Sequence, residues 1–379
     1  MRARALATLE RYVRLETPTG NSAAITELVA MIAERHQDLG GHTVLHPVEG
    51  GVHLVSDFPG VGAAAAAAPI VLIGHSDTVW PVGTLTGDVP WVRNAATIAG
   101  PGVYDMKSGL VVMEETLALL ASAGIDHSPI RIIVTADEEI GSPTSGDLLR
   151  ESVAGCAAAI GFESPHPNGD LKVGRLGSTR LLLTIVGKES HAALDPDSGI
   201  SAAEELVDQL LRVRNIVAHA SEKHSATSQV LYNLGSITAP GLANVVSGAA
   251  SALLGFRFSD PQIESDVLSQ IEALASIRPG ASVTVTRLSY RPAWKPSAAD
   301  LALADRVRAL SPRVGQAPAA GAADTNLLGD LGLPVIDGFG PRGGGAHAAS
   351  EHIVIDSLWE RISLLAGLLS ALHMAPPNK

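Results

Sequence analysis

The stretch VLIGHSDTVW, residues 71–80, begins with four apolar residues and then places His75 and Asp77 two positions apart. A short apolar run of this kind is typical of a strand that is buried on both faces in a parallel sheet. Open α/β sheets bind their ligands at the carboxyl ends of such strands. An imidazole and a carboxylate at this point therefore indicate a polar site at the edge of a buried sheet.

The segments around this stretch alternate between helical and strand patterns up to about residue 170. Helices are predicted over 2–15, 23–39 and 107–124, and strands over 69–74, 129–135 and 157–162. Such alternation is typical of helices packed on both faces of a largely parallel sheet. We therefore predict a three-layer α/β/α domain.

Residues 178–288 follow a different pattern, in the order strand, helix, strand, strand, helix, strand. This β-α-β-β-α-β order is that of a ferredoxin-like unit. The helix and strand alternation returns after residue 295. We therefore predict an α/β fold in which residues 1–176 and 290–379 form the three-layer domain, and residues 177–289 form an inserted ferredoxin-like domain.

Charge and composition exclude several kinds of partner. The 379 residues carry a formal net charge of −12 and present no long basic face, which argues against nucleic acid and anionic membranes. The most apolar run, residues 61–74, is shorter than the roughly 20 residues that a membrane span needs. The single cysteine, Cys156, is compatible with a reducing cytoplasm. Small molecules or short peptides are the expected partners.

Further side chains that can bind metal follow other predicted strands or precede helices. They are Asp105 in GPGVYDMKSG, Glu138 and Glu139 in VTADEEIGS, Glu163 in GFESP and His347 in GGGAHAASEH. Each acid alone could be an ordinary helix-start, cap or turn residue. Together, carboxylates at neighbouring strand ends would repel one another unless a cation neutralised them. Two imidazoles and three carboxylates suit a pair of zinc ions.

A two-metal site would give these residues distinct tasks. One carboxylate has to bridge the metals, and another that binds no metal has to accept a proton from water. Glu138 and Glu139 can divide the tasks of ligand and base, because adjacent side chains point in different directions. Asp77 lies on the same side of an extended segment as His75, so we expect its carboxylate to accept the second imidazole N–H.

Six motifs occur in a fixed order between about residues 70 and 350: GHSDTV, GPGVYDMKSG, ADEEIGS, FESP, ESHAALDPDSGISA and GGGAH. With them the sequence closely resembles the two-zinc metallopeptidase family of bacterial glutamate carboxypeptidases, aminoacylases, succinyl-diaminopimelate desuccinylases and related amidohydrolases. The resemblance implies two zinc ions, with cobalt or manganese as alternatives, and a cis peptide bond after the bridging aspartate. The implied ligands are His75, Asp105 as the bridge, Glu139, Glu163 and His347.

The resemblance also implies the catalytic residues. Glu138 would be the general base, and Asp77 would orient His75. His191, in ESHAALDP, would stabilise the developing oxyanion, often from the partner subunit in this family. The inserted unit would accordingly be a lid and dimerisation domain, and the protein a homodimer.

Three further residues resemble positions that bind substrate or shape its pocket: Asn244, Arg257 and Arg291. Arg291 is the candidate for binding a free carboxylate, because its planar guanidinium offers two parallel donors. Arg257 could equally be structural. Five other histidines are predicted to lie on the surface: His42, His46, His53, His219 and His352.

The match departs from the family pattern near two motifs. The family's Gly-Gly-Thr/Ser-Asp segment reads Gly-Ala-Ala-Asp at residues 321–324, which keeps Asp324 but loses a glycine and the hydroxyl. Ala193 replaces a glycine after His191. These departures concern substrate preference rather than metal chemistry. Glutamate rather than aspartate at position 163 resembles the glutamate carboxypeptidase and tripeptidase side of the family more than the desuccinylase side.

The expected protein is a cytoplasmic, zinc-dependent hydrolase of amide or peptide bonds beside a free carboxylate. Its substrate would be an N-acyl amino acid or a short peptide. A desuccinylase or acetylornithine-type deacylase is the alternative within the family. A catalytically silent binding relative is a further alternative, against which the complete set of ligands and base counts.

Overall fold

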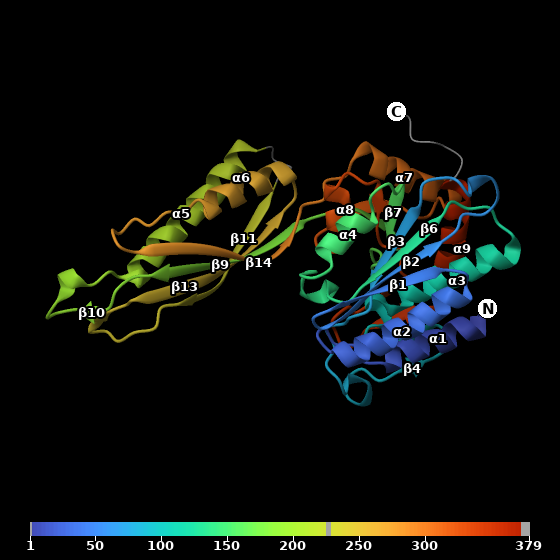
Figure 1. The fold of residues 1–379 in the computed structure, drawn as a ribbon, viewed down its shortest axis with the longest axis horizontal. Helices are drawn as coiled ribbons and strands as arrows, with labels where there is room; N and C mark the ends of the chain where they lie inside the picture. The colour runs from blue at the N-terminus through green and yellow to red at the C-terminus, as the bar shows by residue number, and fades with distance from the viewer. Residues whose placement is uncertain (1, 225–228, 373–379) are drawn as a thin grey trace. The chain divides into compact units, whose positions relative to one another are not determined.

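The computed structural model describes residues 2–224 and 229–372, which divide into two compact units. The first unit comprises the chain up to Gly174, Pro296–Ala319 and the residues from Ala323 onward. The second comprises Arg175–Lys295 with Ala320–Ala322. Each unit has its own main sheet (Figure 1).

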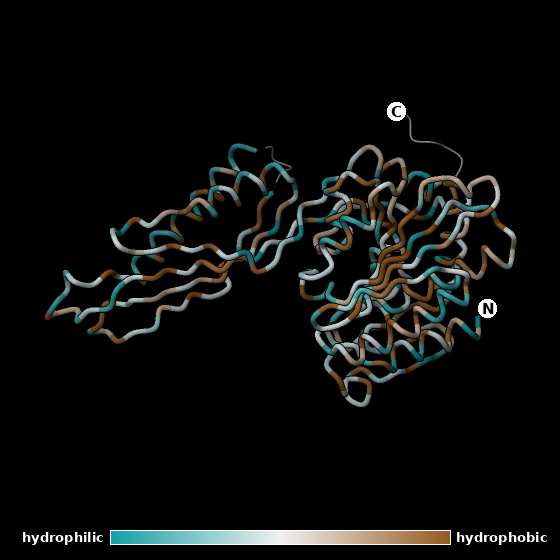
Figure 2. The backbone as a smooth tube through the Cα atoms, viewed as in Figure 1, coloured by the Kyte–Doolittle hydropathy of each residue, from teal (hydrophilic) through white to brown (hydrophobic). Residues whose placement is uncertain are grey.

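The first unit is built on a six-stranded sheet of order β1-β2-β6-β3-β7-β16. Its strands are β1 (His42–Val48), β2 (Gly51–Phe58), β6 (Ile130–Thr135), β3 (Ile70–His75), β7 (Ala158–Gly161) and β16 (Val335–Ile336). The four strands from β6 to β16 are parallel, and all six residues of β3 are buried. The central strands are the most hydrophobic part of this unit (Figure 2).

Helices cover this sheet (Figure 1). They are α1 (Arg2–Arg14), α2 (Ser22–Asp38), α3 (Ser108–Ala123), α4 (Gly146–Ser152), α7 (Ala298–Leu310), α8 (Thr325–Asp330) and α9 (Ile355–Leu372). Short strands complete the unit: β4 (Val92–Arg93), β5 (Thr97–Ala99), β17 (Gly343–Gly344) and β18 (His352–Val354) in one sheet, and β8 (Leu171–Arg175) with β15 (Gln316–Ala319). No helix in the two described stretches combines the length and apolarity needed to cross a bilayer.

The β1–β2 hairpin is an antiparallel addition that the sequence pattern did not predict. Polar residues interrupt its apolar alternation, and Gly50 turns the chain at a φ of 84°. The prediction that His53 lies on the surface is wrong, because this side chain is 1% exposed. Its Nδ1 accepts the N–H of Ala136 at 3.0 Å and its Nε2 lies 3.0 Å from Thr144 Oγ1. Satisfied ring nitrogens allow this histidine to be buried.

The second unit has the β-α-β-β-α-β order expected from its sequence. Its elements are β9 (Gly177–Val186), α5 (Ala202–Lys223), β11 (Val230–Thr238), β13 (Ala249–Phe258), α6 (Pro261–Glu272) and β14 (Ser282–Arg291). The sheet order β11-β13-β9-β14, antiparallel throughout, is that of a ferredoxin-like fold. Alternate residues of β9, including Leu181, Leu183 and Ile185, form its core. A short ribbon of β10 (Ser190–His191) and β12 (Val245–Val246) extends beyond this sheet.

The core of the first unit contains an ionisable residue, Glu114, on helix α3. The side chain is 1% exposed, and its Oε1 accepts the Tyr12 hydroxyl at 2.6 Å. Its Oε2 has no hydrogen-bond partner within the described part of the chain. Burial raises the pKa of Glu114 from 4.5 to about 8, although Tyr12 and Arg35 act in the opposite direction. The carboxyl group is therefore protonated in the folded protein at neutral pH.

Glu114→Gln is expected to flatten the alkaline side of the pH–stability profile. Between pH 4.5 and about 8 the unfolded chain loses a proton that the folded protein keeps. Stability contributed by Glu114 is thus full below pH 4.5 and falls as pH rises, until the folded group also ionises near pH 8. Between pH 4 and pH 8 the variant should gain stability relative to the wild type by on the order of 5 kcal/mol, at 1.4 kcal/mol per pKa unit. Urea unfolding between pH 4 and 9 measures this, and parallel profiles would contradict it.

Candidate metal centre and active site

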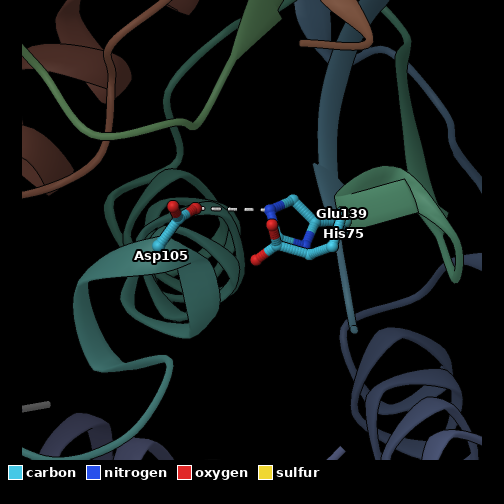
Figure 3. A group of neighbouring side chains, drawn as sticks. All are labelled: His75, Asp105 and Glu139. Atoms are coloured by element: carbon cyan, nitrogen blue, oxygen red, sulfur yellow. Dashed lines mark ion pairs between the residues drawn. The ribbon is translucent and has the colours of Figure 1, made fainter. Parts of the chain in front are cut away.

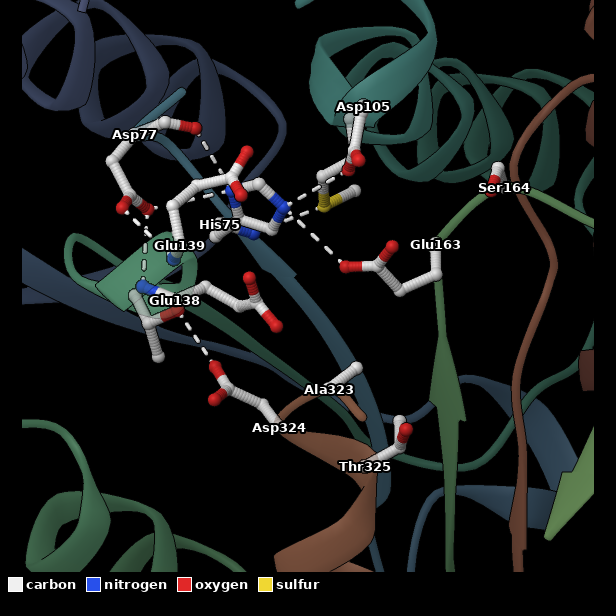
Figure 4. A network of polar contacts seen from close by, with 12 residues as sticks. His75, Asp77, Asp105, Glu138, Glu139, Glu163, Ser164, Ala323, Asp324 and Thr325 are labelled. Carbon is white, nitrogen blue, oxygen red and sulfur yellow. Dashed lines mark hydrogen bonds and ion pairs between the residues drawn. The ribbon is translucent and has the colours of Figure 1, made fainter. Parts of the chain in front are cut away.

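Five residues predicted as metal ligands converge at the carboxyl ends of the parallel strands. Figure 4 labels all of them except His347. His75 ends β3, Glu139 lies in a short helical turn after β6, and Glu163 follows β7. Asp105 lies in the turn that precedes α3, and His347 in the loop between β17 and β18. Segments far apart in the sequence thus bring two imidazoles and three carboxylates together.

The distances divide these residues into two half-sites that share Asp105. His75 Nε2 lies 3.4 Å from Asp105 Oδ1 and 3.3 Å from Glu163 Oε1. His347 Nε2 lies 3.3 Å from Asp105 Oδ2 and 3.3 Å from Glu139 Oε2. The two oxygens of Asp105 therefore face different imidazoles, as a bridging carboxylate requires; Figure 3 shows the contact with His75.

The electrostatics of the cluster favour positive charge. Burial alone would lower the pKa of His75, but Asp105, Asp77 and Glu163 raise it well above the ordinary value. Asp105 and Glu139 raise the pKa of His347 to about 10. Burial opposes ionisation of Asp105, yet the two imidazoles hold its pKa well below the usual range. These carboxylates are therefore arranged around a cationic centre.

The donor atoms fit a pair of divalent metal ions. His75 Nε2 and Glu139 Oε1 are buried and make no hydrogen bond to the described residues. Separations of 3.3–3.4 Å between the paired nitrogens and oxygens exceed the ~2.9 Å of a good hydrogen bond. Buried polar atoms without such partners are costly unless a ligand satisfies them. Imidazole and carboxylate donors suit zinc, cobalt or manganese.

The turn that carries Asp105 contains a cis peptide bond and packs closely against the end of β3. The Asp105–Met106 peptide bond is cis, as the family resemblance implies. Met106 is fully buried, and its sulfur lies 3.0 Å from the backbone nitrogen of His75. A Cβ atom at Gly74 would lie 2.5 Å from that sulfur, which explains the glycine before His75. The turn and the end of β3 thus pack directly on each other.

Asp77 has a different principal contact from the one predicted. Its backbone carbonyl oxygen lies 2.9 Å from His75 Nδ1, whereas its carboxylate oxygen is 3.4 Å from the same atom. The carboxylate accepts the N–H groups of Glu138 and Glu139, each at 3.2 Å, and the Thr19 hydroxyl at 2.7 Å. Asp77 therefore positions the two glutamates as well as the imidazole.

Glu138 lies between the cluster of predicted ligands and Asp324, which precedes helix α8 (Figure 4). It is 7% exposed and borders a small cavity together with Glu163, Asp324 and Thr325. Asp324 accepts hydrogen bonds from the Thr135 hydroxyl at 2.8 Å and from the Ser142 hydroxyl. The structure thus places Glu138 beside the half-site of His75 and Glu163, while Glu139 faces His347.

His191 and Asn244, both predicted to act on substrate, are neighbours in the second unit. His191 pairs with Val245 in the β10–β12 ribbon, and the Ala192 N–H donates to the Asn244 carbonyl at 2.9 Å. His191 is exposed, and its Nδ1 accepts the N–H groups of Ala193 and Leu194 at 3.2 and 3.0 Å. Accepting at Nδ1 leaves the proton on Nε2, where it can be donated.

Arg257 and Arg291 form a second pair in this unit. They flank Ser178 from the two strands that neighbour β9. By this register both arginines lie on the same face of the sheet as Arg180, and burial together with the charges of Arg291 and Arg180 lowers the pKa of Arg257. Ser178 stands at the start of β9, whereas His191 follows its far end, roughly 25 Å of strand away. The structure therefore brings together the residues of each pair but keeps the two pairs apart.

Glu351 is a residue of this region to which the sequence patterns assigned no role. It is the only acid in GGGAHAASEH, four residues after His347. Its carboxylate is fully buried against the turn that carries Asp105. An acid four residues after a predicted ligand was the available signal in the sequence. The groups that the Glu351 carboxylate contacts could not be identified without the fold.

A histidine–carboxylate cluster at the edge of an α/β sheet, with an inserted ferredoxin-like domain, defines a metal-dependent hydrolase. The chain belongs to peptidase family M20/M25/M40, whose profile matches residues 71–371. It is 28% identical over 373 residues to carboxypeptidase G2 from Pseudomonas sp. (strain RS-16), covering 96% of this chain and 88% of the relative. It is 27% identical over 307 residues to succinyl-diaminopimelate desuccinylase from Halorhodospira halophila, covering 76% and 78%. The resemblance seen in the motifs is thus confirmed.

Solved structures share this fold. Aminopeptidase PepT from Bacillus cereus superposes with a TM-score of 0.74 at 20% identity, covering 98% of both chains. An M20 family metallo-carboxypeptidase from Sulfolobus solfataricus gives 0.71 at 16% identity, covering 98% of this chain and 99% of that one. The predicted α/β architecture with an inserted domain is confirmed.

Proposed function

We propose that this protein is a two-zinc hydrolase that cleaves an amide or peptide bond beside a free carboxylate. The observation that carries the proposal is that Asp105 turns its two oxygens toward two imidazoles, with Glu138 beside the pair. The similarity to carboxypeptidase G2 over 96% of the chain supports this branch of the family. The expected substrate is an N-acyl amino acid or a short peptide.

The residues of the first unit have complementary roles in this proposal. Five residues would hold the zinc ions: His75, Asp105, Glu139, Glu163 and His347. When bound, the metal pair supplies a Lewis acid for the carbonyl and lowers the pKa of water. Glu138 accepts the proton of that water and passes it to the leaving amine. Asp77 fixes the backbone from which Glu138 extends, through the 3.2 Å bond to its N–H.

The residues of the second unit would bind the substrate and the oxyanion. Arg291 is proposed to bind the free carboxylate, with Arg257 and Asn244 shaping the pocket. His191 would donate its Nε2–H to the oxyanion. Because β9 separates His191 from the arginines, we propose that it serves the site of a partner subunit in a homodimer. Residues 177–289 would then be a lid and dimerisation domain for the catalytic domain of residues 1–176 and 290–379.

A desuccinylase-type deacylase is the second candidate. The observation that favours it is that Arg180, Arg257 and Arg291 share one face of the sheet, since three guanidinium groups could accommodate a substrate with more than one carboxylate. A silent relative is disfavoured by the complete set of ligands and base. The cytoplasm remains the proposed location.

Amine release from N-acyl amino acids, N-succinyl amino acids and dipeptides tests these assignments. Chelator-treated protein should be inactive and should regain turnover with added zinc, on substrates that have a free carboxylate. Matched substrates with an amidated carboxylate are the control and should react poorly. Turnover that does not depend on metal, or that ignores the carboxylate, would contradict the proposal. Preference for succinyl substrates would favour the second candidate.

A further inference from the structure

The carboxylate of Glu351 accepts four N–H groups. Its Oε2 accepts the Trp80 indole N–H at 2.6 Å and the Gly102 N–H at 2.9 Å. Its Oε1 accepts the backbone N–H groups of Tyr104 at 2.8 Å and Asp105 at 3.1 Å. The side chain is fully buried, so these donors take the place of water around it. Both oxygens are used, and each accepts two hydrogen bonds.

These contacts connect three segments that each carry a proposed metal ligand. Trp80 follows His75 by five residues after β3, and Gly102 begins the turn that presents Asp105. Glu351 itself belongs to the loop of His347. This loop turns at His347, which has a φ of 59°, and the Glu351 N–H donates to the Ala348 carbonyl at 2.9 Å. One carboxylate thus fixes the spacing of the His347 loop from the other two segments.

The two half-sites depend on this spacing to different degrees. His75 ends a fully buried strand and Glu163 lies two residues beyond the end of another, so the sheet itself holds them. The His347 side chain is 51% exposed and extends from a loop. A ligand on such a loop is held only as well as the loop is anchored. The half-site of Asp105, Glu139 and His347 therefore has the greater need of Glu351.

We propose that Glu351 is a positioning residue that holds the His347 loop against the Asp105 turn and thereby sets the affinity of the metal in the Glu139–His347 half-site. The inference rests on the proposed two-metal function and adds a determinant of its second metal. Residues that orient metal ligands typically affect metal affinity by 10–100-fold.

Glu351→Gln tests the inference with little change of volume. The amide retains one acceptor oxygen but turns an NH₂ group toward two N–H donors, so half of the contacts become repulsive. Calorimetric titration of chelator-treated protein with Zn²⁺ should show two sites in the wild type. In the variant one of the two sites should lose about 10–100-fold in affinity, while the other changes by less than about threefold.

Glu114→Gln is the matched control, because it removes an equally buried carboxylate of the same unit that contacts none of these segments. Its two zinc affinities should equal those of the wild type. Trp80→Phe is a second test that keeps Glu351 and removes one of the four donors; it should weaken the same site, by a smaller factor. If circular dichroism shows that Glu351→Gln does not fold, Trp80→Phe tests the inference in its place.

Two outcomes would overturn the inference alone: unchanged affinity at both sites, or equal weakening of both. The second would show a general structural role for the carboxylate rather than an effect on one half-site. Wild-type protein that binds no zinc would instead overturn the proposed function, and this inference with it.

Discussion

Glu138→Ala is expected to retain both metal ions and to lose at least about a thousandfold in turnover, the upper part of the range for general base catalysis. Glu138 is held at its backbone by Asp77 and borders the cavity beside Glu163. Its neighbour Glu139, by contrast, forms the ion pair with His347, at 3.3 Å. Removing its carboxylate should therefore abolish proton transfer without opening the half-site of His347.

Glu139→Ala is the matched control, because it deletes the adjacent carboxylate from the same helical turn. This variant should lose affinity for one metal, and added zinc should restore part of its activity. Metal content by mass spectrometry and initial rates on the best substrate distinguish the two. Loss of a metal from Glu138→Ala would show that Glu138 is a ligand, since it also lies within reach of His75 and Glu163.

Asp105→Ala is expected to have the second large effect, because both half-sites lose a ligand at once. The Oδ1 and Oδ2 atoms of Asp105 face His75 and His347 at 3.4 and 3.3 Å. Both zinc affinities should fall by at least about a hundredfold, since ligands matter more than the residues that orient them. Turnover should be undetectable at micromolar zinc.

Asp137→Ala serves as the control for the loss of Asp105. Asp137 is a buried acid near the site, but its carboxylate accepts the Thr144 N–H and hydroxyl at 2.6 and 2.8 Å. Its loss should lower stability and leave both metals bound, as thermal unfolding and zinc titration can determine. Tight binding of two metals by Asp105→Ala would exclude its role as the bridge.

Elements with a strong local pattern were predictable from the sequence. Strand β3 and helix α3 begin and end within a residue or two of their predicted limits, because an apolar run and a helical pattern each depend on neighbouring residues. The β1–β2 hairpin was missed because His53 breaks the apolar pattern. The burial of His53 depends on Ala136 and Thr144, which come from another part of the chain.

The fold class and the chemical types of the predicted metal ligands follow from the sequence alone, since ordered motifs and strand ends are local features. The three-dimensional packing was needed to show which carboxylate oxygen faces which imidazole, and that the Asp77 carboxylate contacts the N–H groups of Glu138 and Glu139. It likewise placed Glu351 against a turn about 250 residues earlier in the chain. Such contacts join residues distant in sequence, and only packing of the whole sheet and its loops sets their distances.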